Sequence, residues 1–217
     1  MWSSCGSADD IVAGFEHEAD AIRFQAAMAE RLQKFSLTLQ STKTRLLEFG
    51  RHAAADRKRR GLGKPETFDF LGFTHICGRS RAGRFQLRRK SRRDRMRAKL
   101  AAIKQELRRH LHASIPEQGS WLRNVVRGYF AYHAVPTNGP ALGVFRNRVC
   151  VTWLRALRRR SQRQDLTWQQ MARLKDQWLP RPRILHPWPN QRFDVKYPRW
   201  EPDALIGPVR FCAGGAS

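Results

Sequence analysis

The chain lacks the features that would place it in a membrane, in a secreted compartment or around a structural metal. No apolar run approaches the ~20 residues of a membrane-spanning helix, and the first residues lack the basic-then-apolar pattern of a secretory signal. No two cysteines form a Cys-x-x-Cys pair, which argues against a zinc site and a disulfide framework; the cysteines are Cys5, Cys77, Cys150 and Cys212. These absences predict a reduced, cytoplasmic protein with no membrane partner.

Acidic residues are also scarce. Lys and Arg total 42 against 18 Asp and Glu, a formal net charge of +24. The excess is uneven, since residues 1–50 hold five basic and seven acidic residues whereas residues 51–217 hold 37 basic and 11 acidic ones, net +26. Such a surplus repels itself in a compact state unless it faces a polyanion. Nucleic acid is the expected partner, and an anionic membrane surface is the weaker alternative.

The first 50 residues show the strand and helix pattern of a small α+β layer. The apolar run Ile11–Phe15 predicts a strand, which with the preceding segment makes a hairpin whose tip is Asp9-Asp10. A helix is predicted over Glu16–Lys34, with a stripe at helical spacing: Ile22, Ala26, Ala29, Leu32 and Phe35. Two β-like runs follow, Ser36–Gln40 and Arg45–Phe49.

The next segment, up to residue 90, combines a loop and two strands. Arg51–Lys64 is basic and has little periodicity, so we predict a loop. Phe68–Phe73 and Arg84–Leu87 predict two strands, joined by a turn that contains Gly78, Ser80 and Gly83.

A helical pattern begins at Ser91, which we predict to cap a helix. Apolar residues then recur every three or four positions: Met96, Leu100, Ile103, Leu107 and Leu111. Two more helices are predicted by the apolar faces Trp121, Leu122, Val125, Val126, Tyr129, Phe130 and Leu142, Phe145, Val149, Trp153, Leu157. Thr167 with Gln170 predicts a capping box and a short fourth helix, whose apolar residues are Trp168, Met171, Leu174 and Trp178. Prolines from Pro180 onward predict an extended, irregular tail.

Basic residues flank the apolar stripe of the first of these helices on both sides. Arg97, Lys104 and Arg108 stand on one shoulder, and Arg95 and Lys99 stand on the other. Such a helix suits phosphate binding, but long basic side chains also border ordinary core stripes. The predicted nucleic-acid-binding residues are Arg88, Arg89, Lys90, Arg92, Arg93, Arg97, Lys99, Lys104 and Arg108.

The only candidate for catalysis is Ser7-Ala8-Asp9-Asp10, followed by the apolar run at Ile11. Nucleotidyl transfer uses carboxylates that hold two Mg²⁺ ions ~4 Å apart. Adjacent aspartates at a hairpin tip meet that need only with a further carboxylate from another strand. Asp-Asp pairs are also common in ordinary turns.

The segment Ser7–Glu16 resembles the Tyr-x-Asp-Asp hairpin of reverse transcriptases, especially those encoded by bacterial group II introns. The resemblance continues in chain order and covers residues 7–217. It is carried by Phe35–Leu39, Lys43–Leu46, Glu48–Gly50, Phe68–His75, Leu122–Tyr132, Trp153–Arg163, Trp178–Pro180, His186-Pro187 and Cys212–Gly215.

The resemblance implies three parts: a partial reverse-transcriptase palm over 1–90, a helical thumb or maturase-specific domain over 91–179, and a Pro-rich tail over 180–217. It makes Asp9 and Asp10 catalytic residues and ligands of an Mg²⁺ cofactor. It places Lys43, Phe70, Leu71 and Gly72 near the incoming nucleotide and the primer. The thumb would follow the shallow minor groove of an A-form duplex, so RNA is the implied partner.

The sequence departs from the family's pattern in two ways. Ser7 stands where the family has Tyr, and no fingers or earlier palm strand with a further metal-binding aspartate precedes the hairpin. We therefore expect an RNA-binding member of the RNA-directed DNA polymerase family that does not polymerise by itself. Two alternatives stay open: a polymerase half completed by a separate chain with fingers and upstream palm, and a non-catalytic, general nucleic-acid-binding remnant.

Overall fold

The structure is a computed structural model that describes residues 3–6, 10–160, 166–188 and 210–215. These residues combine α-helices with antiparallel strands, which confirms the α+β class. The chain divides into two compact units, residues 1–88 with 199–217 and residues 89–198. Within the described ranges, no helix is long and apolar enough to cross a bilayer.

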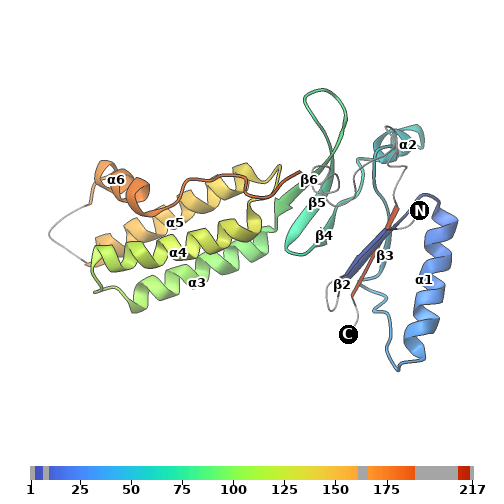
Figure 1. The fold of residues 1–217 in the computed structure, drawn as a ribbon, viewed down its shortest axis with the longest axis horizontal. Coiled ribbons are helices and arrows are strands. Elements are labelled where there is room, and N and C mark those ends of the chain that lie inside the picture. Colours follow the sequence, from blue (N-terminus) through green and yellow to red (C-terminus); the bar gives the residue numbers. More distant parts are fainter. Residues whose placement is uncertain (1–2, 7–9, 161–165, 189–209, 216–217) are drawn as a thin grey trace. The chain divides into compact units, whose positions relative to one another are not determined.

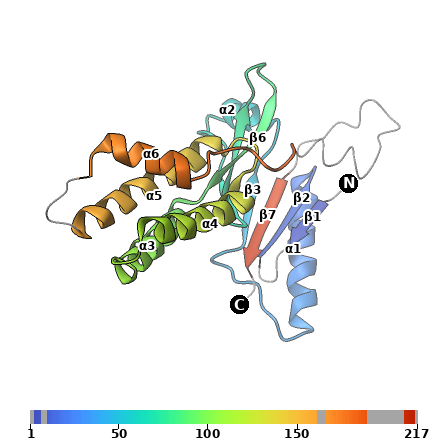
Figure 2. The same ribbon diagram turned by 60° about the vertical axis from the view of Figure 1, so that its left-hand side comes forward.

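The first unit contains a four-stranded sheet with the order β1-β2-β7-β3, in which neighbouring strands are antiparallel (Figures 1 and 2). Its strands are β1 (Ser3–Gly6), β2 (Asp10–Phe15), β3 (Arg45–Glu48) and β7 (Arg210–Gly215). The pairing of Gly6 with Ile11 confirms the hairpin, but Asp10, which was predicted at its tip with Asp9, is the first residue of β2. Residues 7–9 lie outside the described residues. Strand β7 corrects the prediction of an irregular tail. Prolines block a strand only where they stand, and none follows Pro208.

Helix α1 (Glu18–Gln33) packs on this sheet through a different face from the one predicted. Ile22 and Phe35 belong to the predicted stripe but are 52% and 67% exposed. The core contact is made by Ala21, which is fully buried, and by Phe24, whose ring lies 5.1 Å from that of Phe15. The prediction was wrong because alanines and larger apolar residues occur on all sides of this helix, so that their spacing alone does not identify the buried face.

The second sheet has the order β4-β5-β6, and the last three residues of β6 belong to the second unit. Its strands are β4 (Phe68–Phe70), β5 (Phe73–Arg79) and β6 (Phe85–Ser91). The single strand predicted over Phe68–Phe73 is wrong, because Leu71 and Gly72 have φ of 48° and 75° and form a turn between two paired strands. Two positive φ angles are the geometry of a two-residue hairpin turn.

Three other local predictions in this unit are corrected. Helix α2 (Ala53–Arg59) replaces the predicted loop, because seven residues are too few to show periodicity. Its three alanines favour a helix, and its basic last turn suits the negative end of the helix dipole. The strand predicted over Ser36–Gln40 is reduced to a single bridge at Leu39, since Ser36 ends the preceding turn with φ 57°. Gly78 lies within β5 and not in the β5–β6 turn, which spans residues 80–84.

The second unit is a helical bundle built around one large core (Figure 1). Its helices are α3 (Arg93–Arg109), α4 (Ile115–His133), α5 (Gly139–Arg160) and α6 (Trp168–Trp178). The α3 stripe is confirmed, with Ile103 and Leu107 buried and Met96, Leu100 and Leu111 packed against the core. The apolar faces predicted for α4 and α5 are confirmed too. On α6, Met171 is buried but Trp168 is 57% exposed, so Trp168 is not a core residue.

The start of α3 is anchored by a buried amide. Ser91, predicted as the N-cap, is instead the last residue of β6, and Arg92 occupies the cap position without a side-chain cap bond. The Ser91 backbone N–H donates to Asn138 Oδ1 at 3.0 Å, and Asn138 Nδ2 donates to Ser91 Oγ at 2.8 Å. The Ser91 side chain, which the sequence pattern predicted to cap α3, thus bonds Asn138 in the turn between α4 and α5.

A second buried amide joins three helices. Gln118 at the start of α4 donates to the backbone oxygens of His110 at 2.9 Å and Ala113 at 3.3 Å, both just beyond α3. Its Oε1 accepts from Trp153 Nε1 of α5 at 2.8 Å. Both Gln118 and Trp153 are buried, so these bonds satisfy groups that would otherwise lose their water partners.

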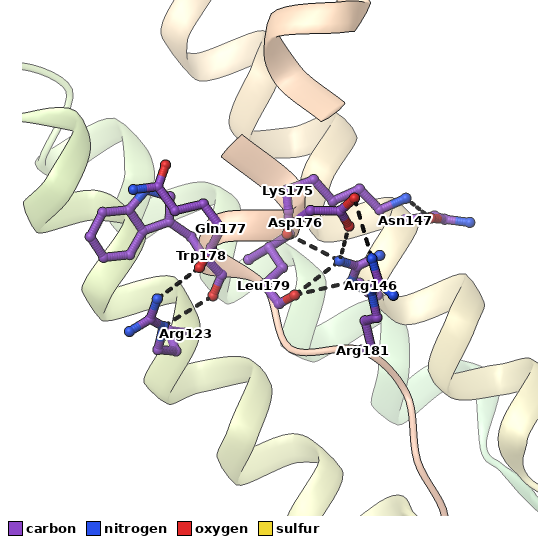
Figure 3. Close-up of polar contacts among 9 residues, drawn as sticks. All are labelled: Arg123, Arg146, Asn147, Lys175, Asp176, Gln177, Trp178, Leu179 and Arg181. Carbon is purple, nitrogen blue, oxygen red and sulfur yellow. Dashed lines mark hydrogen bonds and ion pairs between the residues drawn. The ribbon is translucent and has the colours of Figure 1, made fainter. Parts of the chain in front are cut away.

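Two arginines hold the C-terminal end of α6 (Figure 3). Arg146 of α5 is 8% exposed and donates to the backbone oxygens of Leu179 and Lys175, at 3.0 and 3.1 Å, and to the Asp176 carboxylate at 2.8 Å. Arg123 of α4 donates to the Gln177 oxygen at 2.7 Å. A helix end leaves its last carbonyls without partners, and these guanidinium groups supply them.

Shortening a buried side chain of the α3 stripe should lower the free energy of unfolding strongly. Leu107→Ala should lower the free energy of unfolding by roughly 2–5 kcal/mol, because Leu107 is 1% exposed and its removal leaves a cavity. Val144→Ala on the exposed face of α5 should change it by less than ~0.5 kcal/mol. Denaturant unfolding followed by tryptophan fluorescence measures both. Equal costs for the two variants would show that the stripe is not packed.

The capping of α6 generates a second prediction. Arg146→Met should cost roughly 2–4 kcal/mol of unfolding free energy, because it removes bonds from a charged donor that are worth ~1.5–3 kcal/mol each. Arg173→Met on the exposed side of α6 is the matched control and should stay within ~0.5 kcal/mol of the parent protein. The prediction is wrong if both substitutions give the same unfolding midpoint.

Candidate nucleic-acid interface

The predicted catalytic carboxylates lie at one end of the four-stranded sheet. Asp10 is exposed and begins β2, where its partner on the neighbouring strand β7 is Gly215. Asp9 lies outside the described residues. Magnesium needs several oxygen ligands, and residues 210–217 contain no Asp or Glu side chain. Within the described ranges, no group of three or more His, Cys, Asp or Glu is placed to hold a metal. The donors described around Asp10 therefore do not fit a magnesium site.

The residues predicted near nucleotide and primer stand on different elements of the first unit. Lys43 is exposed in the turn before β3, where its backbone N–H donates to the Gln40 oxygen. Phe70 is buried at the end of β4 and belongs to the same apolar cluster as Val12 of β2. Leu71 and Gly72 form the turn that follows, and Leu71 is 41% exposed. One core thus joins the strand that Asp10 begins to the strand that ends at Phe70.

The basic residues around the start of α3 divide into engaged and exposed ones. Arg88 donates to the Arg79 oxygen at 2.8 Å, and Arg92 pairs with Asp94 at 2.6 Å. The Arg92 guanidinium holds the pKa of the Asp94 carboxyl below its ordinary value. The Arg89 backbone N–H donates to Thr137. Lys90 and Arg93 are exposed. Local partners therefore hold part of this predicted set in place.

The cations further along α3 are exposed, and none of them has an acidic partner in the described part of the chain. Arg97, Lys99, Lys104 and Arg108 all face solvent, and no ion pair with a described residue is found for any of them. Glu106, the only acidic residue in this stretch of α3, pairs with Arg109 at 2.7 Å. Positive charge on this helix is therefore left unneutralised by the described part of the chain.

Helix α5 adds two cations that the sequence-based prediction missed. Arg155 and Arg159 line a groove of about 250 Å³ between α3 and α5, together with Lys104 and Arg108. Residues four apart lie on one face of a helix, so the two pairs stand opposite each other. The spacing of Arg155 and Arg159 was a visible signal, but it did not reveal which helix they would meet.

The neighbouring arginines of α5 have structural roles instead. Arg158 donates to the Leu166 oxygen at 2.9 Å, and Arg160 donates to the Ala113 oxygen at 2.7 Å. No such bond is found for Arg155 or Arg159 among the described residues. At this end of α5, the guanidinium groups of Arg155 and Arg159 are thus available to a ligand as far as the described residues go.

Comparison of the chain with protein-family models, with curated proteins and with solved structures found no match. The features that bear on function are therefore the exposed cations of the helical unit and the ordered motifs of the sequence.

Proposed function

We propose that this chain binds RNA through the basic surface of α3 and α5, as a fragment of the group II intron reverse transcriptase and maturase type. In this proposal, the first unit corresponds to part of the palm and the helical unit to the thumb. The observation that carries it is the groove between α3 and α5, where four cations meet without an acidic partner among the described residues.

The charge arrangement favours a phosphate backbone as the ligand. Four like charges around one groove repel each other, and a polyanion removes that cost. The planar guanidinium of Arg can donate two parallel N–H bonds to one phosphate group. The arginines of the groove therefore suit a ligand that carries phosphates. RNA duplexes present their phosphates and ribose hydroxyls across a wide, shallow minor groove, which a helical surface can follow. Structured RNA is therefore the proposed partner, with no membrane involved.

The geometry around Asp10 supports a fragment that does not polymerise by itself. Strand β7 lies directly beside β2, and it brings Gly215 opposite Asp10. Two-metal nucleotidyl transfer needs more oxygen ligands than one pair of aspartates supplies, so another strand has to provide a further carboxylate. Among the described residues, no third carboxylate is thus placed beside Asp10 to complete a magnesium site.

RNA binding is tested by its dependence on salt. Phosphate contacts release counterions, so affinity should fall linearly on a log–log salt plot, with a slope near −5 for about six contacts. Exchanging Arg97, Lys104 and Arg108 together for Gln should flatten that slope by roughly two to three units. Fluorescence anisotropy with a labelled RNA hairpin measures affinity and slope. The same assay with B-form DNA of equal length should show weaker binding.

The control variant exchanges Arg127, Arg148 and Arg173 for Gln, three exposed cations that do not line the groove. It carries the same charge change and should affect the slope less. A folded α3 triple variant with unchanged affinity and slope would show that these side chains only border the core. Equal affinity for RNA and DNA would favour the general nucleic-acid-binding remnant.

The absence of autonomous polymerisation is a separate prediction. The purified chain with Mg²⁺ should give no template-dependent extension of a primer, because the carboxylate set is incomplete. Robust extension that disappears in Asp10→Asn would overturn this. Extension that appears only when a second polypeptide supplies fingers and upstream palm would support the alternative of a complemented polymerase half.

A further inference from the structure

The groove between α3 and α5 has two chemically different parts. Its rim carries Lys104 and Arg108 on one side and Arg155 and Arg159 on the other. Its floor is apolar and includes Leu111, which is half-buried, and Ala156, which is 9% exposed. A ligand that fills this groove must therefore place an anion at the rim and apolar surface on the floor.

We infer that this groove receives one unpaired nucleotide of the bound RNA. This inference rests on the proposed function and assigns it a particular structural feature of the ligand. The phosphates lie at the basic rim, and the base and ribose lie on the floor. A perfectly paired A-form helix keeps its bases stacked and offers only backbone, whereas bulges and loops present unstacked bases to a protein.

The size of the groove supports a single nucleotide. Its volume of about 250 Å³ is below the ~300–1,000 Å³ of pockets that enclose drug-sized ligands. One base with its ribose suits such a space, but a folded loop does not. Exposed cations of α3 lie beyond the groove, so the strand that carries this nucleotide can continue over them.

Charge beyond the groove indicates a continuing polyanion and not an isolated anion. Arg93 and Arg97 precede Lys104 and Arg108 on the same shoulder of α3. From Arg93 to Arg108 the helix rises ~22 Å, far more than one phosphate group occupies. A row of exposed cations of this length matches successive phosphates of one nucleic-acid strand.

An acidic amphipathic helix of a protein is the competing occupant, because it also combines anions with apolar side chains. The two occupants differ in one testable respect. Removal of a single base from an RNA changes only the floor contact of the nucleotide, and it leaves every phosphate in place.

The experiment uses three labelled RNA hairpins: one fully paired, one with a single bulged nucleotide, and one with an abasic residue at the same bulge. Anisotropy titrations with the full chain should show the bulged hairpin bound roughly tenfold more tightly than the other two. We expect this small factor because the floor is aliphatic, and a base gains more by stacking on an aromatic ring. The paired hairpin and the abasic hairpin should bind alike.

Two variants test the floor and the rim separately. Ala156→Leu fills the floor and should abolish the preference for the bulge, while affinity for the paired hairpin and its salt slope stay unchanged. Arg155→Gln with Arg159→Gln should weaken all three complexes and flatten the slope by roughly two units. Arg127→Gln with Arg173→Gln is the charge-matched control and should keep the tenfold preference. If circular dichroism shows that Ala156→Leu does not fold, Thr152→Met fills the same groove from the neighbouring turn of α5.

The outcomes separate this inference from the proposed function. If no RNA binds with a salt-dependent affinity, the proposed function fails and the groove assignment fails with it. If all three hairpins bind equally while the slope is steep, RNA binding stands and the nucleotide in the groove is wrong. If an acidic helical peptide binds, loses affinity in Ala156→Leu, and the hairpins remain equal, the groove belongs to a protein partner and the inference is overturned.

Discussion

The hydrogen bonds of the buried Gln118 are the constraint on which the helical unit depends. They tie the end of α3 to the start of α4 and, through Trp153 Nε1 at 2.8 Å, to the middle of α5. Trp153 is followed by Leu154 and then Arg155, so the position of Trp153 sets where the α5 side of the groove lies. Buried polar groups are costly when unpaired, and this network therefore favours the arrangement of the three helices that pairs them. The separation of the four rim cations is a consequence of that arrangement.

The many arginines of this chain divide into two groups by what their guanidinium groups contact. Arg123 and Arg146 bond the last carbonyls of α6 (Figure 3), and Arg160 bonds a carbonyl beyond α3. These side chains hold the bundle together, and their charge is partly satisfied by backbone dipoles. Arg155 and Arg159 have no such bonds among the described residues. Net charge alone therefore overstates the surface that a polyanion can use, and only the second group supports the proposed RNA binding.

The first unit shows how a strand from the end of the chain can lie beside a strand from its beginning. Strand β7 separates β2 from β3 and pairs with both, and it contains no acidic residue. Strand β7 thus places a glycine, and not a carboxylate, beside Asp10. A pair of aspartates at a hairpin is an incomplete signal, because the third ligand must come from a strand that is distant in sequence.

Local pattern determined the parts of this protein in which one face of an element dominates. The stripe from Met96 to Leu111 identified α3 because its large apolar residues lie on one side only, and Thr167 with Gln170 identified the start of α6 because a capping box is a local bond pair. Tertiary structure decided the rest. The prediction of the buried face of α1 was wrong because alanines occur on all sides of this helix. Ser91 does not cap α3 because its side chain bonds Asn138, which lies 47 positions away in the sequence. Arg155 and Arg159 became candidate ligand-binding residues for the same reason: spacing places two side chains on one face of a helix, but only packing determines which helix that face meets.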